Sequence, residues 1–156
     1  MGDRGKIVAP LPLGILFLLS CSAIRSDVVG FEAACSQDPG REVTVEGFVS
    51  SETSTCSLDS SGVRECPFAI ADADRTRDIL FSLVEGNGSN QVKTPEADMK
   101  EKPSITTFKV TSFEIVGDRG TVVDIGKKVF LSGKTTLLVS STGKAVCRLD
   151  EATITQ

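Results

Sequence analysis

The sequence predicts an all-β domain built on five main strands. Apolar and polar residues alternate over short runs that clusters of Gly, Asp and Ser separate, which is typical of half-buried strands joined by turns. Two of the longer runs contain an internal glycine, and a glycine inside a strand often marks a bulge or a sharp bend. The strands are expected at residues 41–50, 67–72, 79–84, 127–139 and 145–154.

The first three strands differ in how their apolar residues are spaced. In the first, Val43 and Val45 alternate with polar residues before Gly47 interrupts the run. In the second, Phe68 and Ile70 fall on one face of the strand. The third is apolar on both faces apart from one serine, so we expect neighbouring elements to cover both of its faces.

The segment between the third and fourth strands, residues 86–125, carries a weaker pattern. It begins with a long polar stretch, in which a short helix is expected at residues 95–100 because a proline suits the first helical position. Residues 106–116 look extended, and residues 121–123 are expected to return as a short strand. We therefore expect an extra hairpin or a loop insertion.

The chain from residue 41 to 155 resembles an OB-fold, a small five-stranded barrel. The resemblance rests on Val43-Thr44-Val45-Glu46-Gly47 and Val129-Phe130-Leu131-Ser132-Gly133, which match its first and fourth strands, and on Phe68-Ala69-Ile70-Ala71-Asp72, which matches its second. An OB-fold usually has a helix between its third and fourth strands, whereas residues 106–116 look extended here. A β-sandwich is the alternative architecture.

The N-terminal residues indicate export and lipid anchoring. An uncharged apolar run at residues 7–19 is too short for a membrane-spanning helix of about 20 residues and suits a signal-peptide core. It ends in Leu18-Leu19-Ser20-Cys21, which resembles the lipobox of bacterial lipoproteins and implies cleavage before a lipidated Cys21. Cleavage after Ala23 by an ordinary signal peptidase, or an uncleaved apolar anchor, are the alternatives.

This interpretation divides the chain into a signal peptide (1–20), a lipidated N-terminus and tether (21–40) and an OB-like domain (41–156). The protein is then expected in a bacterial cell envelope, facing the periplasm or the exterior. The membrane is its first partner, through Cys21.

The remaining cysteines predict two disulfides, because disulfides persist in exported proteins. Four cysteines allow three pairings. We favour Cys56–Cys66, which would close a short polar loop, and Cys35–Cys147, which would tie the tether to the last strand. A zinc site is the alternative, but the chain has no His and no Cys-x-x-Cys spacing.

The composition narrows the range of functions. Without His, the chain contains neither a Ser-His-Asp nor a Cys-His mechanism, and we expect no enzyme activity and no cofactor. Asp72, Asp74 and Asp78 cluster around one expected turn and are candidate cation ligands. Their spacing lacks the Gly and Glu of a calcium loop, and Asp is also favoured in solvated turns.

Charge is unevenly distributed along the chain. Residues 41–101 hold 6 basic and 12 acidic residues, whereas residues 102–149 hold 8 basic and 3 acidic residues. A candidate anion-facing patch on the last two strands consists of Lys127, Lys128, Lys134, Lys144 and Arg148. Solvent-facing lysines that discourage edge-to-edge association are the alternative interpretation.

The leading hypothesis is a non-catalytic, lipid-anchored binding or assembly module, whose partner is a protein or a small anionic molecule. One alternative is an exported metal-dependent hydrolase that uses the Asp72–Asp78 cluster. The other is an OB-fold nucleic-acid binder. The net charge of −4 and the acidic turns near the second strand disfavour nucleic acid.

Overall fold

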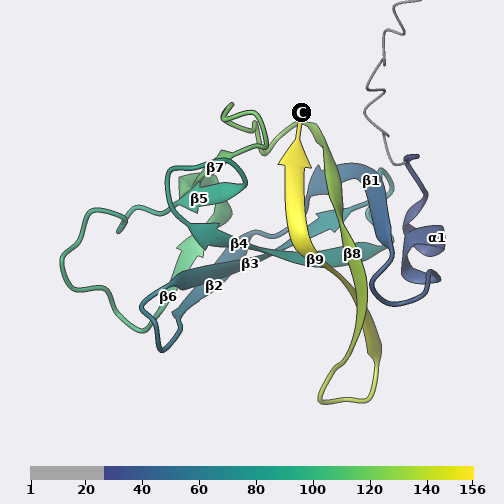
Figure 1. The fold of residues 1–156 in the computed structure, drawn as a ribbon, viewed down its shortest axis with the longest axis horizontal. Helices are drawn as coiled ribbons and strands as arrows, with labels where there is room; N and C mark the ends of the chain where they lie inside the picture. The colour runs from purple at the N-terminus through teal and green to yellow at the C-terminus, as the bar shows by residue number, and fades with distance from the viewer. Residues whose placement is uncertain (1–26) are drawn as a thin grey trace, which may run out of the picture.

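Strands dominate the computed structural model, which describes residues 27–156 (Figure 1). They are β1 (Glu42–Val49), β2 (Thr53–Leu58), β3 (Arg64–Ala71), β4 (Asp78–Glu85), β5 (Gln91–Lys93), β6 (Ile105–Lys109), β7 (Glu114–Val116), β8 (Lys128–Val139) and β9 (Ala145–Thr155). A short helix, α1 (Phe31–Cys35), and a 3₁₀ turn, η1 (Val110–Ser112), also occur in this part. The all-β expectation is confirmed. The signal peptide expected at residues 1–20 and the expected lipidation site, Cys21, lie outside the described residues.

The strands form one mixed sheet in the order β6-β2-β3-β1-β8-β9-β4-β5-β7. A further pairing joins β3 to β4, so β1, β3, β4, β9 and β8 close a ring of neighbouring strands. Within this ring only β4 and β9 run parallel, with Leu80 beside Arg148 and Phe81 beside Leu149. The ring uses the five strands expected from the sequence.

The two strand glycines lie where neighbouring backbone passes very close. A Cβ on Gly47 would lie 2.2 Å from the carbonyl oxygen of Ala71, and one on Gly133 would lie 2.7 Å from that of Asp150. The pairing of β8 with β9 also shifts register between Ser132 and Lys134. Gly133 alone separates Ser132 from Lys134, whereas Glu151 and Ala152 separate their partners, so the bulge lies in β9 opposite Gly133, where Glu151 has a φ of 52°.

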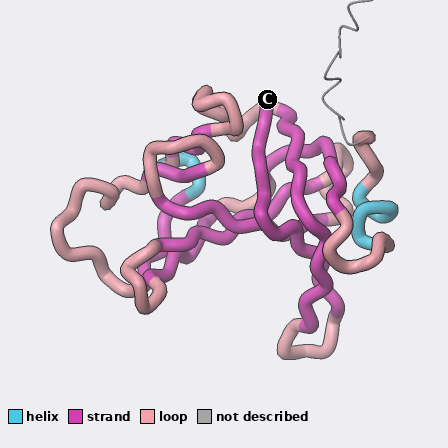
Figure 2. The backbone as a smooth tube through the Cα atoms, viewed as in Figure 1, coloured by secondary structure: helices cyan, strands magenta, loops and turns pink. Residues whose placement is uncertain are grey.

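The other strands extend the ring on one side (Figure 2). Strand β2 pairs with β3 and β6, whereas β5 pairs with β4 and β7. The insertion expected at residues 86–125 thus supplies three strands and η1. Its strands β5 and β7 pair with each other, while β6 joins β2 instead.

Three local expectations differ from the structure. Residues 95–100 form turns rather than a helix, with i→i+3 backbone bonds at Ala97 and Met99. Residues 121–123 make one isolated bridge, from Val122 to Val116, instead of a strand. Strand β2 is not predicted, because its Ser and Thr residues lack apolar alternation.

One hydrophobic core joins the five-stranded ring to the added strands β2, β5, β6 and β7. The rings of Phe68 and Phe81 stack with centroids 5.5 Å apart, and Phe113 meets Phe68 edge-on at 5.4 Å. Phe113 in turn contacts Phe108 of β6 at 5.4 Å. Offset and edge-on aromatic pairs are favourable beyond the effect of their buried area. These aromatic contacts therefore hold η1 against the five strands that form the closed ring.

Both disulfides have the pairing favoured by the sequence. Cys56–Cys66 joins β2 to β3 with a Cα–Cα distance of 4.2 Å. Cys35–Cys147 joins α1 to β9 with a Cα–Cα distance of 5.5 Å, across a sequence separation of 112. Two such bonds are typical of a protein exported to an oxidising compartment.

The chain packs on the ring well before residue 41, inside the segment expected to be a tether. Val28 bridges Thr44 of β1, and the backbone N–H of Val29 donates to the Thr44 carbonyl at 2.8 Å. Phe31 and Ala34 of α1 are buried in the core. None of the helices within residues 27–156 has the length and apolar character needed to span a membrane.

Candidate functional site

The Asp cluster flanks the turn between β3 and β4. The carboxylate of Asp72 accepts hydrogen bonds from the hydroxyl and the backbone N–H of Thr76, both at 2.8 Å. The Thr76 hydroxyl is the main reason why the pKa of Asp72 lies below its ordinary value. Asp78 accepts a bond from Ser50 at 2.9 Å. Within the described residues, no group of three or more His, Cys, Asp or Glu is arranged to hold a metal ion.

Most of the candidate anion-facing patch is already paired with carboxylates. Lys144, in the turn between β8 and β9, is the exception and makes no ion pair with any described residue. The patch therefore carries little unpaired positive charge. Its ion pairs are Lys127–Asp124 (3.5 Å), Lys128–Glu46 (3.5 Å), Lys134–Glu151 (2.6 Å), Arg148–Glu65 (3.2 Å) and Arg148–Asp150 (2.7 Å).

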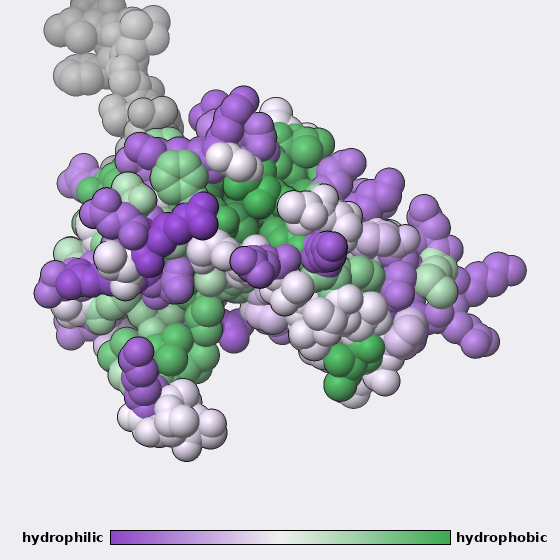
Figure 3. All heavy atoms as spheres, turned by 180° about the vertical axis from the view of Figure 1, so that it is seen from behind, coloured by the Kyte–Doolittle hydropathy of each residue, from purple (hydrophilic) through white to green (hydrophobic). Residues whose placement is uncertain are grey.

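The hairpin of β8 and β9 continues beyond the ring and projects from the body of the molecule (Figure 1). Pairing of β8 with β1 ends at Lys134, so we name residues 136–147 the arm. Its side chains Leu137, Leu138 and Val139 are 49%, 38% and 76% exposed. Figure 3 shows apolar side chains gathered where this hairpin leaves the body. The arm is the candidate binding surface.

The apolar residues of the arm continue a row that is buried elsewhere in β8. Val129 and Leu131 face the core, and because side chains alternate along a strand, Leu137 and Val139 lie on that same face. The row thus runs from the interior into solvent. At its base, Leu137 lies opposite Cys147, whose disulfide to Cys35 fixes α1 beside the arm.

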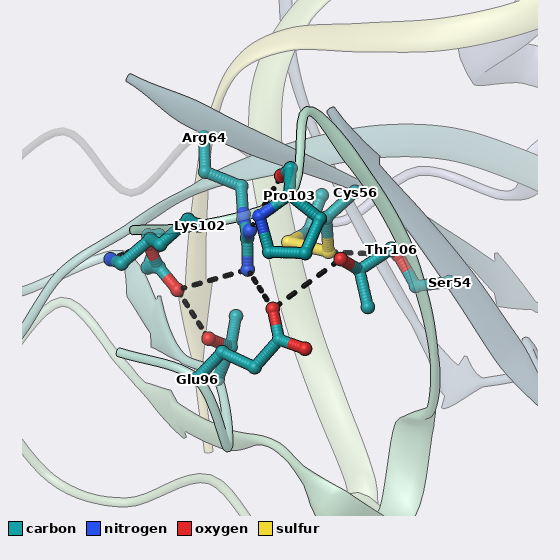
Figure 4. A network of polar contacts seen from close by, with 10 residues as sticks. Ser54, Cys56, Arg64, Glu96, Lys102, Pro103 and Thr106 are labelled. Atoms are coloured by element: carbon teal, nitrogen blue, oxygen red, sulfur yellow. Dashed lines mark hydrogen bonds and ion pairs between the residues drawn. A yellow bond between two sulfur atoms is a disulfide. The ribbon is translucent and has the colours of Figure 1, made fainter. Parts of the chain in front are cut away.

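A second polar feature is a buried arginine of β3 that contacts the loop between β5 and β6 (Figure 4). The Arg64 side chain, at the start of β3, is 0% exposed. Its Nη1 lies 3.1 Å from a carboxylate oxygen of Glu96 and 3.8 Å from one of Glu85. Its Nη2 donates to the carbonyl of Pro103 at 2.9 Å, and the guanidinium lies 5.8 Å from the ring centroid of Phe108.

Glu85 completes this network from β4. Lys102 and Thr94 each donate a hydrogen bond to its carboxylate. Burial raises the pKa of Glu85, but these hydrogen bonds and the charges of Lys102 and Arg64 outweigh burial, so the pKa lies below its ordinary value. A buried carboxylate between two cations stays ionised.

The geometry gives the Arg64 network a structural role. Arg64 and Glu85 are closed to solvent, while Glu96 and Pro103 belong to the long loop between β5 and β6. The network therefore holds that loop against β3 and β4, with the side chains of Glu96 and Lys102 at its edge, 22% and 23% exposed. The Nε of Arg64 has no hydrogen-bond partner among residues 27–156, which adds to the cost of its burial.

The sequence contains one signal for Arg64. Phe68 and Ile70 share a face of β3, and extending their alternation backwards places Cys66 and Arg64 on that inward face. The expected strand begins at residue 67, so this extension is missed. Nothing local identifies Glu85 or Glu96 as its partners, because they lie 21 and 32 residues further along the chain.

A shallow groove of about 490 Å³ lies between the N-terminal segment and the β3–β4 turn. Val28 and Phe31 line it on one side, Asp72 and Arg77 on the other. The ion pair between Arg77 and Glu32 spans 2.8 Å at its edge. Both charges of this pair are satisfied within the protein.

Comparison of the chain with protein-family models, curated proteins and solved structures finds no match.

Proposed function

We propose that this protein is an exported, lipid-anchored binding or assembly module without catalytic activity. The observation that carries the proposal is the arm, which exposes three large apolar side chains on a projecting hairpin. Contiguous exposed apolar side chains of this kind mark interaction sites. The disulfide at its base and the ring of strands hold the arm in a fixed direction, as a binding element requires.

We assign the ring of five strands to an OB-like barrel. Its order β8-β1-β3-β4 corresponds to the 4-1-2-3 order of a Greek key, and the OB-fold is a five-stranded Greek-key barrel. Strands β2, β5, β6 and β7 are additions to that plan. They argue for a function specific to this chain rather than one inherited from a minimal barrel.

Lipid anchoring at Cys21 is supported by the lipobox-like sequence Leu18-Leu19-Ser20-Cys21 and by the two disulfides, which fit an exported protein. A module tethered in this way acts at a membrane surface and needs only moderate affinity for partners that share that surface.

A metal-dependent hydrolase is less well supported than a binding module. The carboxylate of Asp72 is engaged by both polar groups of Thr76, so its oxygens already serve the turn. A nucleic-acid binder would use the face of the second and third barrel strands, β3 and β4. Arg148 of β9, which lies beside Leu80 of β4, is paired with Glu65 of β3.

The anchoring half of the proposal is tested by intact-mass analysis of the full chain expressed in a bacterial host. Detergent extracts of the membrane fraction should contain a chain that begins at Cys21 and carries a diacylglyceryl adduct. Cys21→Ser should remove the adduct and move the protein to the soluble fraction. A soluble product of the unchanged chain that begins at Ile24 would contradict anchoring.

The binding half is tested by photo-crosslinking in the same membranes. A photoreactive amino acid at position 139, in the arm, should form covalent adducts with a macromolecule. The same amino acid at position 105, which is 67% exposed on β6, is the matched control. Equal adduct yields from the two positions, or none from either, would contradict a binding role for the arm.

A further inference from the structure

The connection between β4 and β5 contains an exposed Asn-Gly pair. Asn87, Gly88 and Ser89 are all exposed in the turn that follows β4. Gly88 has no Cβ to shield its backbone nitrogen. In an Asn-Gly pair this nitrogen attacks the side-chain amide carbon of the asparagine, and any larger side chain on the second residue hinders the attack. The turn therefore presents both reacting groups of a deamidation site to solvent.

The side chain of Asn87 is not held by the fold. Its amide makes no hydrogen bond with any of residues 27–156. The other asparagine of the chain, Asn90, differs in two ways. Its side-chain oxygen accepts a hydrogen bond from the backbone N–H of Ile154 in β9 at 2.9 Å, and the residue after it is Gln91 rather than glycine. Of the two asparagines, only Asn87 has both a free amide and an unshielded neighbouring nitrogen.

The side chain of Gln91 restrains the attacking nitrogen. Its oxygen accepts a hydrogen bond from the backbone N–H of Gly88 at 2.7 Å. A Cβ built on Gly88 would lie 3.0 Å from the same oxygen, so the Gln91 amide packs directly against the turn. Attack requires the Gly88 nitrogen to lose its proton and to approach the Asn87 side chain. The bond to Gln91 must break first, so it slows the reaction.

We propose that Asn87 is a self-modification site, at which the side-chain amide is lost as ammonia and a carboxylate replaces it. The Gly88 nitrogen forms a bond to Cγ of Asn87, and the bond from Cγ to the amide nitrogen breaks. The departing nitrogen takes up the proton that Gly88 has lost, which leaves a cyclic imide and free ammonia. Water then opens the imide at one carbonyl to give aspartate, or at the other to give isoaspartate. Water is the only co-reactant, and the inference is independent of the binding function proposed above.

The isoaspartate product changes the connection as well as its charge. In isoaspartate the main chain runs through the side-chain carbon, so residues 86–90 gain one backbone atom. These residues join two parallel strands, in which Glu85 of β4 lies beside Val92 of β5. The Glu85 carboxylate also contacts Lys102 of the β5–β6 loop. A longer connection disturbs this pairing, so trypsin should cut the β5–β6 loop faster in the modified protein.

Peptide mapping by mass spectrometry tests the site in the full-length protein. The protein is purified from the bacterial host and incubated in neutral and mildly alkaline buffers. The peptide that contains Asn87 should gain one mass unit with time and separate into two products of equal mass, aspartate and isoaspartate. Fragmentation of that peptide should place the change at Asn87 and leave Asn90 unchanged. The rate should rise with pH, because the Gly88 nitrogen attacks only after it has lost its proton.

Two variants separate the chemistry of the pair from its exposure. Gly88→Ala leaves Asn87 exposed but shields the attacking nitrogen, so conversion should slow severalfold. The added carbon meets only the movable end of the Gln91 side chain, so the turn should persist. Gln91→Leu removes the acceptor of the Gly88 N–H and should speed conversion severalfold. A synthetic peptide of residues 83–94 gives the reference rate outside the fold.

Three results would overturn this inference. The first is an unchanged Asn87 in the folded protein after the synthetic peptide has reached half conversion. The second is equal conversion in Gly88→Ala and the unchanged protein, which would exclude attack by the Gly88 nitrogen. The third is a glycan on Asn87, because Asn87-Gly88-Ser89 also matches the acceptor pattern for N-glycosylation, and a glycan would occupy the amide nitrogen. Slower conversion in Gln91→Leu would overturn the restraint by Gln91.

Discussion

Arg64 is the residue on which the position of the β5–β6 loop depends. Its guanidinium reaches Glu96 and the Pro103 carbonyl of that loop, and Glu85 of β4 lies beside it. Arg64→Ala leaves two carboxylates without a buried cation, and removal of one partner of a buried ion pair costs about 3–5 kcal/mol. We expect a loss of this size in the free energy of unfolding, measured by urea denaturation.

Arg148→Ala is the matched control for that measurement. Arg148 also contacts two carboxylates, Glu65 and Asp150, but its side chain is 32% exposed. Pairs near the surface contribute about 0–1 kcal/mol, so this variant should unfold near the urea midpoint of the unchanged protein. Equal losses in the two variants would show that burial of Arg64 has no special weight.

Glu85 should make stability depend on acid pH. Its folded-state pKa lies below the ordinary value of 4.5, so the unfolded state binds more protons in this range. The contribution is therefore fully present above about pH 4.5 and is lost as the pH falls through the folded-state pKa.

Urea titrations at a series of pH values between neutral and acid conditions measure this dependence. Glu85→Gln should flatten the fall in stability below pH 4.5 while lowering stability at neutral pH. Asp59 and Asp72 also have lowered pKa values, but the unchanged protein and the Glu85→Gln variant both contain them. The difference between the stability curves of these two proteins therefore reports on Glu85. Parallel curves would contradict the assignment.

Among the elements, β1 depends on a glycine that lets β3 approach. A methyl group at Gly47 would meet the Ala71 carbonyl oxygen at 2.2 Å, so Gly47→Ala requires the two strands to separate. Overpacking of this kind costs about 1–3 kcal/mol. Gly30→Ala, with no atom within 4 Å of the added carbon, should change stability by less than about 0.5 kcal/mol. Thermal unfolding compares them, and a Gly47→Ala variant as stable as Gly30→Ala would refute the close approach.

The strands of the ring are predictable because their signal is local. Val43 and Val45, or Phe68 and Ile70, reveal a buried face through their spacing alone. Strand β2 gives no such signal, since Ser54 is buried only because neighbouring strands cover it. The helix expected at residues 95–100 fails for a related reason, because Arg64 binds the Glu96 side chain and fixes that loop in turns.

The candidate site also combines one property that the sequence shows with another that only the fold determines. In the sequence, Leu131 and Leu137 belong to one alternating apolar row of β8. Nothing in that row shows at which residue a neighbouring strand stops covering β8. The pairing partner decides it, because β1 stops opposite Lys134. Exposure of the arm is therefore a property of topology, whereas its apolar character is readable in the sequence.

For the molecule as a whole, the two disulfides should differ in how much each stabilises the folded protein. In the chain-entropy model a longer closed loop restricts the unfolded chain more, so Cys35–Cys147 should stabilise by about 1–2 kcal/mol more than Cys56–Cys66. Replacing each pair by alanines and comparing urea midpoints and m-values tests this ordering. Equal losses would remove the argument from loop length, while the pairing itself would stand.

The Cys35–Cys147 bond also decides what proteolysis can release. The bond closes residues 35–147 into a covalent loop, so a single backbone cleavage within that loop releases no fragment. Trypsin cleavage at exposed Lys100 should leave a single full-size band on a non-reducing gel and two fragments after reduction. If Cys21 holds the protein at a membrane, a single nick there cannot shed the domain. Shedding would require a second cut or a reductant, so the protein would persist on a surface exposed to proteases.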